Sequence, residues 1–222
     1  MSGGTGTVFL YGAGGHAKVV LDVLRARGIF PSCVCDDAPE AASEFCGLPV
    51  LRGTAAPAGA AIVSIGKSEA RREIVEFLRS RGDVEFLTAV HPSAVVSPSA
   101  RLGAGTVVMP GALVNAEAVV GEHCIVNTGA SIDHDCRIGD FSHIAPHATL
   151  CGNVSVGEGT WIGAGATVIQ GVSIGKRCFV GAGTVVAKDL PDGAFACTER
   201  KLFVKASQNT PPPFGGGKSA AR

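Results

Sequence analysis

The sequence predicts an α/β N-terminal domain followed by an all-β parallel β-helix. Strand-like and helix-like segments alternate over roughly the first ninety residues, which is typical of a small parallel sheet covered by helices. A six-residue repeat then continues without interruption from Val96 to Pro191. Thirty-one glycines and an aromatic content of 5% favour tight turns and small core side chains. We expect the α/β domain at 1–92, the β-helix at 93–197, and a closing segment with a disordered Pro/Gly-rich tail at 198–222.

The N-terminal domain is predicted from a regular succession of strands and helices. The segment "TVFLYGAGGHAKVVLDVL" (7–24) indicates a strand, a glycine turn and an amphipathic helix. Further strands are expected at "SCVCDD" (32–37) and "AIVSIG" (61–66), and a helix at "KSEARREIVEFLRSRG" (67–82). The segment "VEFLTAVHP" (84–92) leads into the repeat. This alternation predicts a small Rossmann-like parallel sheet.

The repeat divides into sixteen consecutive hexads, each of which opens with Val, Leu or Ile and carries a small residue at nearly every fifth position. An amphipathic helix needs a period near 3.6 and an ordinary strand a period of 2, so neither fits. Period six fits a parallel β-helix in which each hexad supplies one short strand and one corner, with the opener and the fifth residue pointing inward. Three hexads make one triangular coil, so residues eighteen apart in the sequence stack in one column. Successive residues of a column are then about 4.8 Å apart.

Charge and hydropathy exclude several classes of partner. The 19 basic and 19 acidic residues cancel without any run of like charge, so the sequence predicts no nucleic-acid or anionic-membrane binding. We see neither a transmembrane segment nor a signal peptide, and therefore expect a cytoplasmic protein without membrane insertion. The eight cysteines are scattered without a CxxC pair, so we expect them to be reduced and to act as small apolar fillers.

Gly12, Gly14 and Gly15 follow the first predicted strand and open the first helix. Free backbone N–H groups and the positive end of a helix dipole then lie where a diphosphate could bind. Asp36 and Asp37 end the next strand, where a ribose or base would lie. The pattern "GAGGHA" is not GxGxxG, so a nicotinamide dinucleotide is not expected. A purely structural strand-to-helix turn is an equal alternative.

Taken together with the repeat, "YGAGGHAKVVLDVL" resembles the N-terminal domain of bacterial nucleotide-sugar acetyltransferases, which include bacillosamine-pathway, perosamine and sialic acid enzymes. The resemblance covers about residues 7–195. The repeat is similar to that of the hexapeptide-repeat acyltransferases, which implies that the β-helix is left-handed. The resemblance also implies that the N-terminal domain holds a nucleotide-diphosphate sugar. Acetyl-coenzyme A would be held by the β-helix of a homotrimer.

The same resemblance assigns roles to single residues of the N-terminal domain. His16 of "GGHA" would contact the sugar nucleotide. Lys67 of "SIGKSEA" would lie at the nucleotide, together with Asp36 and Asp37. The base that these residues would recognise is left open between uracil and guanine.

The segment "SIDHDCRIGDFSHIAPHATLCG" (131–152) concentrates titratable residues inside the repeat. His134 holds the third place of its hexad, at a corner, so we expect its ring to project outward and not into the core. In the family the matching histidine is the general base and the next carboxylate, here Asp135, orients it. Asn127 and His143 match family positions near the acceptor sugar, although an ordinary surface histidine is an alternative for His143.

The eighteen-residue column through His134 continues to Gly152, Gln170 and Lys188. Gly152 has no side chain, which leaves room for a thioester and exposes a backbone N–H that can bind its carbonyl oxygen. The family uses a glycine amide at the matching place. Gln170 and Lys188 are candidates to meet the pantetheine arm and a phosphate of coenzyme A.

Two other functions are open to a β-helix of this kind. A carbonic anhydrase-like zinc site needs three converging histidines, but the histidines of the repeat include no pair eighteen or thirty-six residues apart, so no metal is expected. No argument gives His123 or His147 a chemical role, so we interpret both as structural, and His91 as a residue that caps or packs the domain junction. The other alternative is a non-catalytic trimer that binds a nucleotide sugar.

Within the enzyme class, the acceptor atom is either nitrogen or oxygen. The resemblance implies N-acetylation of the 4-amino group of a 4-amino-4,6-dideoxy sugar, carried by GDP (perosamine) or UDP (a bacillosamine precursor), with O-acetylation of the sialic acid type as the alternative. Cys136 occupies an inward fifth position, and Cys151 also flanks His134 in sequence. We expect direct attack on the thioester without an acetyl-cysteine intermediate.

Overall fold

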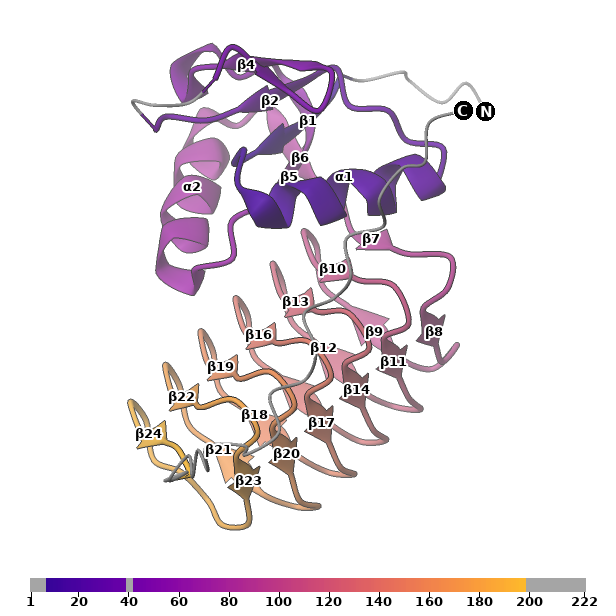
Figure 1. Ribbon diagram of the computed structural model, residues 1–222, viewed down its shortest axis with the longest axis vertical. Helices are drawn as coiled ribbons and strands as arrows, with labels where there is room; N and C mark the ends of the chain where they lie inside the picture. The colour runs from indigo at the N-terminus through magenta and orange to yellow at the C-terminus, as the bar shows by residue number, and fades with distance from the viewer. Residues whose placement is uncertain (1–6, 39–41, 199–222) are drawn as a thin grey trace, which may run out of the picture.

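The computed structural model describes residues 7–38 and 42–198, which form an α/β domain seated on a left-handed parallel β-helix (Figure 1). The predicted fold class is confirmed. The predicted tail lies outside the described residues, except for Thr198. None of the helices in the described segments is long and apolar enough to cross a membrane.

The N-terminal sheet has six strands in the order β3-β4-β2-β1-β5-β6. Strand β3 is antiparallel to β4, and the other neighbours are parallel. The elements of this domain are β1 (Val8–Tyr11), α1 (Gly15–Ala26), β2 (Cys33–Cys35), β3 (Glu44–Phe45), β4 (Leu48–Leu51), the 3-10 turn η1 (Gly53–Ala55), β5 (Gly59–Val63), α2 (Ser68–Arg81) and β6 (Val84–Phe86). The β3–β4 hairpin was not anticipated from the sequence.

Both helices form because their apolar residues recur at helical spacing. Helix α1 buries Val20, Leu21 and Leu24 against the sheet and the first β-helix coil. Helix α2 buries Val75 and Leu78 against the opposite face of the sheet, and it ends at a glycine in the left-handed conformation. The two helices therefore cover the two faces of the sheet, and α1 also lies across the top of the β-helix (Figure 1).

The β-helix has three flat faces, which we name after their strands. The β16 face contains β7 (Ala89–Val90), β10 (Val107–Val108), β13 (Ile125–Val126), β16 (His143–Ile144), β19 (Trp161–Ile162), β22 (Phe179–Val180) and β24 (Phe195–Ala196). The β14 face contains β8 (Val95–Val96), β11 (Leu113–Val114), β14 (Ser131–Ile132), β17 (Thr149–Leu150), β20 (Thr167–Val168) and β23 (Val185–Val186). The β15 face contains β9 (Arg101–Leu102), β12 (Val119–Val120), β15 (Arg137–Ile138), β18 (Ser155–Val156) and β21 (Ser173–Ile174).

The strand register follows the eighteen-residue column. Ile132 pairs with Leu150, and Leu150 pairs with Val168. The first strand of the β-helix, β7, precedes the boundary that we expected at residue 93, because Val107 and Val108 already pair with residues 89 and 90. At the other end, Phe179 pairs with Phe195, so the last coil is two residues shorter than the others.

Each corner uses a left-handed backbone at the fourth position of the hexad, from Gly105 to Gly183. Glycine accepts this conformation at little cost, which explains the glycines at seven of these corners. Several corners nevertheless carry a side chain there, including Asp135 (φ 60°) and Phe141 (φ 58°). The side chains at such corners stand on the outside of the spiral, where they can meet a ligand or another domain.

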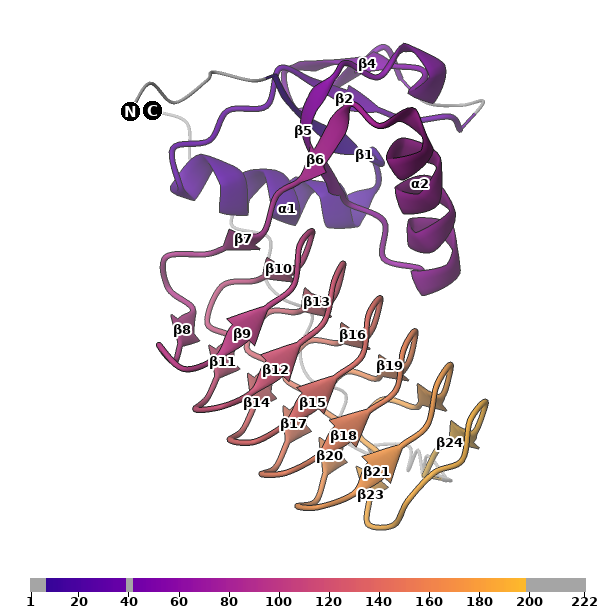
Figure 2. The same ribbon diagram turned by 180° about the vertical axis from the view of Figure 1, so that it is seen from behind.

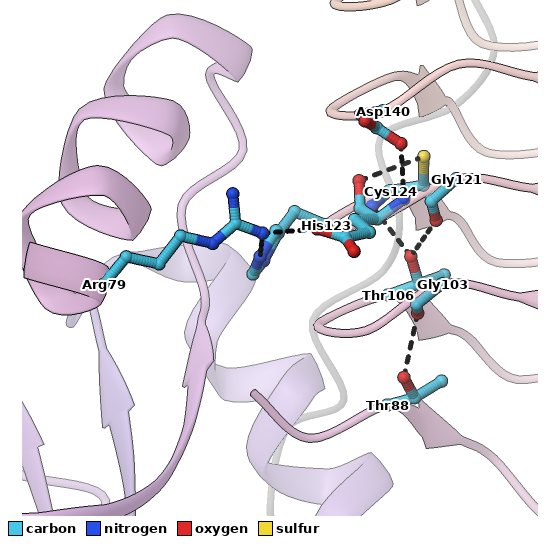
Figure 3. Close-up of polar contacts among 9 residues, drawn as sticks. Arg79, Thr88, Gly103, Thr106, Gly121, His123, Cys124 and Asp140 are labelled. Atoms are coloured by element: carbon cyan, nitrogen blue, oxygen red, sulfur yellow. Dashed lines mark hydrogen bonds and ion pairs between the residues drawn. The ribbon is translucent and has the colours of Figure 1, made fainter. Parts of the chain in front are cut away.

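The corner between the β15 and β16 faces, which we call the β15/β16 corner, is tightly packed. A glycine holds the second position in successive coils, and a Cβ atom at Gly103 or Gly139 would lie within 2.6 Å of the next coil's backbone. Side chains of Thr106 and Cys124 donate hydrogen bonds to the carbonyls of Gly121 and Gly139 in the following coil. Figure 3 shows the start of this column, which begins at Thr88 and continues through Ser142, Thr160 and Cys178.

Helix α2 docks against this same corner, which Figure 2 shows from behind. Arg72 forms an ion pair with Glu158 at 2.5 Å, and Arg79 forms one with Glu122. The ring of Phe141 belongs to the apolar cluster between α2 and the sheet. The two domains therefore share an apolar contact as well as surface ion pairs.

Candidate active site

A pocket of about 460 Å³ opens at the carboxyl ends of the parallel strands β1, β2 and β5. Its lining includes the predicted residues Gly12, Gly14, Gly15, His16, Asp36 and Asp37. Gly12 has a φ of 107°, and a Cβ atom there would lie 2.8 Å from the side chain of Ile65. Gly14 and Gly15 face open space at the start of α1, so the helix N-terminus is accessible to an anion.

The two aspartates at the end of β2 are held by the protein. Asp36 accepts the N–H of Ala13 at 2.6 Å and the N–H of Ala38 at 2.8 Å, so it fixes the glycine turn. Asp37 accepts the hydroxyl of Tyr11 and the N–H of Gly53, and these hydrogen bonds lower the pKa of its carboxyl group. Both side chains line the pocket while they also shape it.

Lys67 stands beside the pocket and not in its wall. It is the N-cap residue of α2, its side chain is exposed, and the neighbouring Gly66 lines the pocket in its place. A lysine side chain has the reach to approach a phosphate from this position. Its predicted role at the nucleotide stays a prediction.

His16 and His143 come together across the domain boundary. Their ring centroids lie 6.2 Å apart, with His16 on α1 and His143 on the outside of β16. Asn127 uses its carbonyl oxygen to accept the N–H of Thr128, so its amide nitrogen faces Nε2 of His143 at 3.0 Å. Burial and the nearby charge of Arg71 lower the pKa of His16 to about 4 and that of His143 to about 3. Both rings are therefore neutral at pH 7.

His134 has the opposite environment. Its ring is outside the spiral, as the hexad register predicts, and 60% of the side chain is exposed in the single chain. Nδ1 lies 2.8 Å from a carboxylate oxygen of Asp135, and the backbone N–H is held by Asp133. The hydrogen bond to Asp135 and the charge of Asp133 raise the pKa of His134. Nε2 has no partner among the hydrogen bonds of this ring to the described residues.

Gly152 lies directly against this ring. A Cβ atom at Gly152 would lie 2.5 Å from Cε1 and 2.6 Å from Nε2 of His134. The glycine therefore makes room first for the imidazole itself, and a thioester would have to approach from outside both. The Gly152 carbonyl accepts the N–H of Gly171, whereas its own N–H has no acceptor among the backbone and side-chain groups of the described segments.

Gln170 and Lys188 continue the column as expected, and both are exposed. Lys188 lines a separate hollow of about 490 Å³ at the end of the β-helix, together with Phe195 and Thr198. An elongated molecule that starts at His134 would pass these side chains on its way to that end.

The histidines that we interpreted as structural have local partners. His123 is fully buried between the rings of Phe86 and Phe141, and burial lowers its pKa to about 3. Nδ1 of His91 lies 2.8 Å from the hydroxyl of Ser93 at the domain junction. His147 is exposed, with its ring over Gly129.

The cysteines are not joined by disulfides. The thiol of Cys136 donates to the carbonyl of Cys151 and is buried in the core of the β-helix. All eight cysteines are free thiols. Within 7–38 and 42–198, no group of three or more His, Cys, Asp or Glu side chains is arranged to hold a metal ion.

Arg71 is buried, although the sequence did not identify it as a candidate functional residue. Arg71 is 1% exposed, and its guanidinium binds carbonyls of both domains. A charged residue in a helix is normally taken as solvent-facing. The available signal was its place four and seven residues before Val75 and Leu78, on the apolar face of α2.

The predicted residues gather in two places on one chain. The pocket, His16, Asn127 and His143 form one group where the N-terminal domain meets the β16 face. His134, Asp135 and Gly152 form another at the corner between the β14 and β15 faces. The pocket lining contains no residue of the β-helix.

Two known sequence families match this chain. The PglD N-terminal domain matches residues 7–78, and the bacterial transferase hexapeptide (six repeats) matches residues 117–152 and 153–188. UDP-N-acetylbacillosamine N-acetyltransferase from Bacillus subtilis (strain 168) is 40% identical over 108 residues, which are 45% of this chain and 50% of that protein. The chain thus spans about half the length of that curated relative.

Solved structures with the same two-domain arrangement extend the comparison. GDP-perosamine N-acetyltransferase from Caulobacter crescentus, with one histidine replaced by alanine and with CoA and GDP-perosamine bound, has a TM-score of 0.81 and 41% identity over 89% of this chain and 96% of that one. The same histidine is replaced by asparagine in a second structure. The acetyltransferase domain of PglB from Neisseria gonorrhoeae FA1090 has a TM-score of 0.81 and 35% identity over 86% and 96% of the two chains.

Proposed function

Because this chain belongs to the family of hexapeptide-repeat nucleotide-sugar N-acetyltransferases, we propose that it transfers the acetyl group of acetyl-coenzyme A to the 4-amino group of a nucleotide-linked 4-amino-4,6-dideoxy sugar. The observation that carries the proposal is the His134 ring, whose Nδ1 is hydrogen-bonded to Asp135 and whose Cε1–Nε2 edge lies against Gly152. The acceptor is GDP-perosamine or a UDP-linked bacillosamine precursor, by analogy with the relatives.

In this proposal His134 is the general base. A carboxylate on Nδ1 keeps the proton on that nitrogen, so Nε2 has the free lone pair that accepts a proton from the attacking amine. Asp135 also stabilises the imidazolium that forms during the attack. The exposure of the ring supports this role, because the substrate must arrive from outside the spiral.

The acetyl donor lies along the His134 column. The free N–H of Gly152 supports a role as the hydrogen-bond donor to the thioester oxygen, which becomes negative as the amine attacks. Gln170 and Lys188 then meet the pantetheine arm and a phosphate of coenzyme A. The amine attacks the carbonyl directly, the carbon–sulfur bond breaks, and the thiolate of coenzyme A leaves with the proton that His134 accepted.

The acceptor nucleotide occupies the pocket of the N-terminal domain. Its diphosphate lies at the start of α1, where Gly14 and Gly15 leave open space, and Lys67 approaches it from outside. Asp36 and Asp37 shape the wall near the ribose and base. His16, Asn127 and His143 then adjoin the sugar, and the neutral state of both histidines suits contact with an uncharged hydroxyl or amine.

A homotrimer accounts for the separation of the two groups of residues. The acceptor pocket and His134 lie on different sides of one chain, so we propose that His134 and Gly152 of one copy face the pocket of the next. Closed cyclic assembly places every base beside a neighbour's pocket. The site is then complete only between copies.

The test is a panel of UDP- and GDP-linked 4-amino-4,6-dideoxy sugars incubated with acetyl-coenzyme A and analysed by mass spectrometry. We expect an N-acetylated product with one of them, and a fall in kcat of at least ~10²-fold when His134→Asn removes the base. His147→Asn, an exposed histidine outside both groups, is the matched control and should retain full activity. Binding without transfer, or full activity in His134→Asn, would contradict the proposal.

A further inference from the structure

We infer that Arg71 is a positioning residue that fixes the nucleotide pocket to the β-helix, an inference that rests on the proposed function. Arg71 lies in α2, and its guanidinium makes four hydrogen bonds to backbone carbonyls. Two of these carbonyls belong to the edge of the pocket, and two belong to successive coils of the β-helix.

The pocket side of this contact is the loop after β5. Nη1 of Arg71 donates to the carbonyls of Ile65 at 2.7 Å and Gly66 at 2.9 Å. Both residues line the pocket. The contact therefore holds one wall of the pocket in place from behind, without a polar group of Arg71 entering the pocket.

The β-helix side of the contact is the β15/β16 corner. Nε donates to the carbonyl of His123 at 2.8 Å, and Nη2 donates to the carbonyl of Phe141 at 2.7 Å. Both acceptors are fourth-position corner residues with a left-handed backbone, and the backbone hydrogen bonds of the β-helix do not use their carbonyls. The planar fork of a guanidinium spans the two coils, whereas a lysine ammonium would be a single point of contact.

Arg71 differs from a surface arginine in its burial and in its partners. Arg71 is 1% exposed, and its four partners are neutral carbonyls, with no ion pair to a carboxylate of residues 7–38 or 42–198. A buried cation is costly unless its hydrogen bonds are satisfied, so its position depends on all four carbonyls staying in place. The four contacts therefore act together and fix the distance between the pocket wall and the coils.

The consequence for the reaction is geometric. If the β-helices form the frame of the trimer, the placement of each N-terminal domain on its own β-helix decides where the sugar amine lies relative to His134 of the neighbouring copy. A displacement of about 1 Å can lower a rate by about 100-fold. Arg71 thus controls kcat through position, while nucleotide affinity depends on groups that Arg71 leaves unchanged.

The experiment compares Arg71→Lys with Arg79→Ala. Arg79 is a matched control, because it lies two turns further along α2, touches the same corner through Glu122 and His123, and does not contact the pocket wall. Affinity for UDP and GDP is measured by calorimetry, and kcat is measured with saturating acceptor. For Arg71→Lys we expect kcat to fall by about 10- to 100-fold while the Kd of the nucleotide changes by less than about 3-fold. Arg79→Ala should keep its kcat.

Two results would overturn the inference. One is an unchanged kcat in folded Arg71→Lys, which would make the residue merely structural. The other is a loss of nucleotide affinity as large as the loss of kcat, which would make Arg71 part of the binding site itself.

Hydrogen–deuterium exchange supplies a measurement that needs no turnover. Peptides covering residues 60–75 should exchange faster in Arg71→Lys than in Arg79→Ala. If the wild type acetylates no amino sugar, the proposed function fails, and this exchange experiment still decides whether Arg71 ties the pocket to the coils.

Discussion

The four histidines near the candidate site differ in one physical respect, which is how far each ring is removed from water. Burial lowers the pKa of His16, His123 and His143, so these rings stay neutral and act as hydrogen-bonding or packing groups. His134 keeps its contact with solvent, and its carboxylate neighbours raise its pKa. Of the four, only His134 is therefore set up to exchange a proton near neutral pH.

This difference predicts a shift in the pH profile of Asp135→Asn. Base catalysis needs neutral His134, so kcat/KM should fall as pH decreases through the pKa of that ring. Asp135 raises this pKa by stabilising the imidazolium, so an amide in its place should move the acidic limb to lower pH. The rate on the plateau should also fall, because the ring loses its orienting partner. The measurement is kcat/KM from pH 5 to 9, and a limb that stays where it is in the wild type would exclude His134 as the titrating base.

Residue pairs within the repeat could be predicted from the sequence, whereas pairs between domains could not. The contact between His134 and Gly152 follows from eighteen-residue arithmetic alone, because the coils have a constant length. The contact between His16 and His143 depends on how α1 is seated on the β16 face, which no local pattern encodes. The eighteen-residue spacing did not predict that the imidazole of His134 fills the space beside Gly152, because that depends on the rotamer of His134.

At the scale of elements, the β15/β16 corner is built from two coordinated columns. A glycine at each second position lets successive coils approach closely, and a hydroxyl or thiol at each fifth position donates to a carbonyl of the next coil. The acceptor is a glycine carbonyl for all but Cys178, which donates to Pro191. Our interpretation of the cysteines as small apolar fillers was therefore incomplete, because Cys124 and Cys178 also serve as donors. Thr, Cys and Ser replace one another in this column because each has a small side chain that carries a hydrogen-bond donor.

The column predicts different costs for two substitutions of Cys124. Cys124→Ser keeps the donor and nearly the volume, as Ser142 does one coil later, and should change the free energy of unfolding by less than about 0.5 kcal/mol. Cys124→Ala leaves the Gly139 carbonyl without its donor and should cost about 1–2 kcal/mol. Urea unfolding at one fixed protein concentration measures both, with exposed Cys46→Ala as the neutral control. An equal decrease in the free energy of unfolding in the Ser and Ala variants would show that the hydrogen bond does not contribute to stability.

Elements with a strong period were predictable and elements without one were not. The hexads predict the strands of the β-helix because the inward opener recurs sixteen times. The β3–β4 hairpin gives no such signal, since β3 has two residues and β4 contains Pro49. The short last coil was also missed, because Phe195 pairs with Phe179 after the hexads have ended.

At the scale of the whole molecule, the two groups of candidate residues lie on different sides of the β-helix. The acceptor group is fixed where α1 and α2 meet the β16 face, and the His134 group lies at the corner between the β14 and β15 faces. A rigid β-helix does not bend to bring them together. Either another copy supplies the missing half, or the transfer occurs within one chain after a large movement of the N-terminal domain.

Mixed oligomers distinguish these two possibilities. His134→Asn removes the base, and Gly15→Phe fills the pocket from a position where an added side chain meets open space and the backbone is not strained. Each variant alone should be inactive. If base and pocket come from neighbouring copies, random co-assembly of the two variants should restore roughly a quarter of the wild-type rate, because half of the bases and half of the pockets are intact. If the site lies within one chain, every copy in the mixture carries one defect and the rate stays at background.

The two variants are therefore co-refolded from urea at equal concentration. The control is an unmixed pair of the purified proteins, assayed in the same way. The absence of any recovered activity in verified mixed trimers would exclude a site shared between copies.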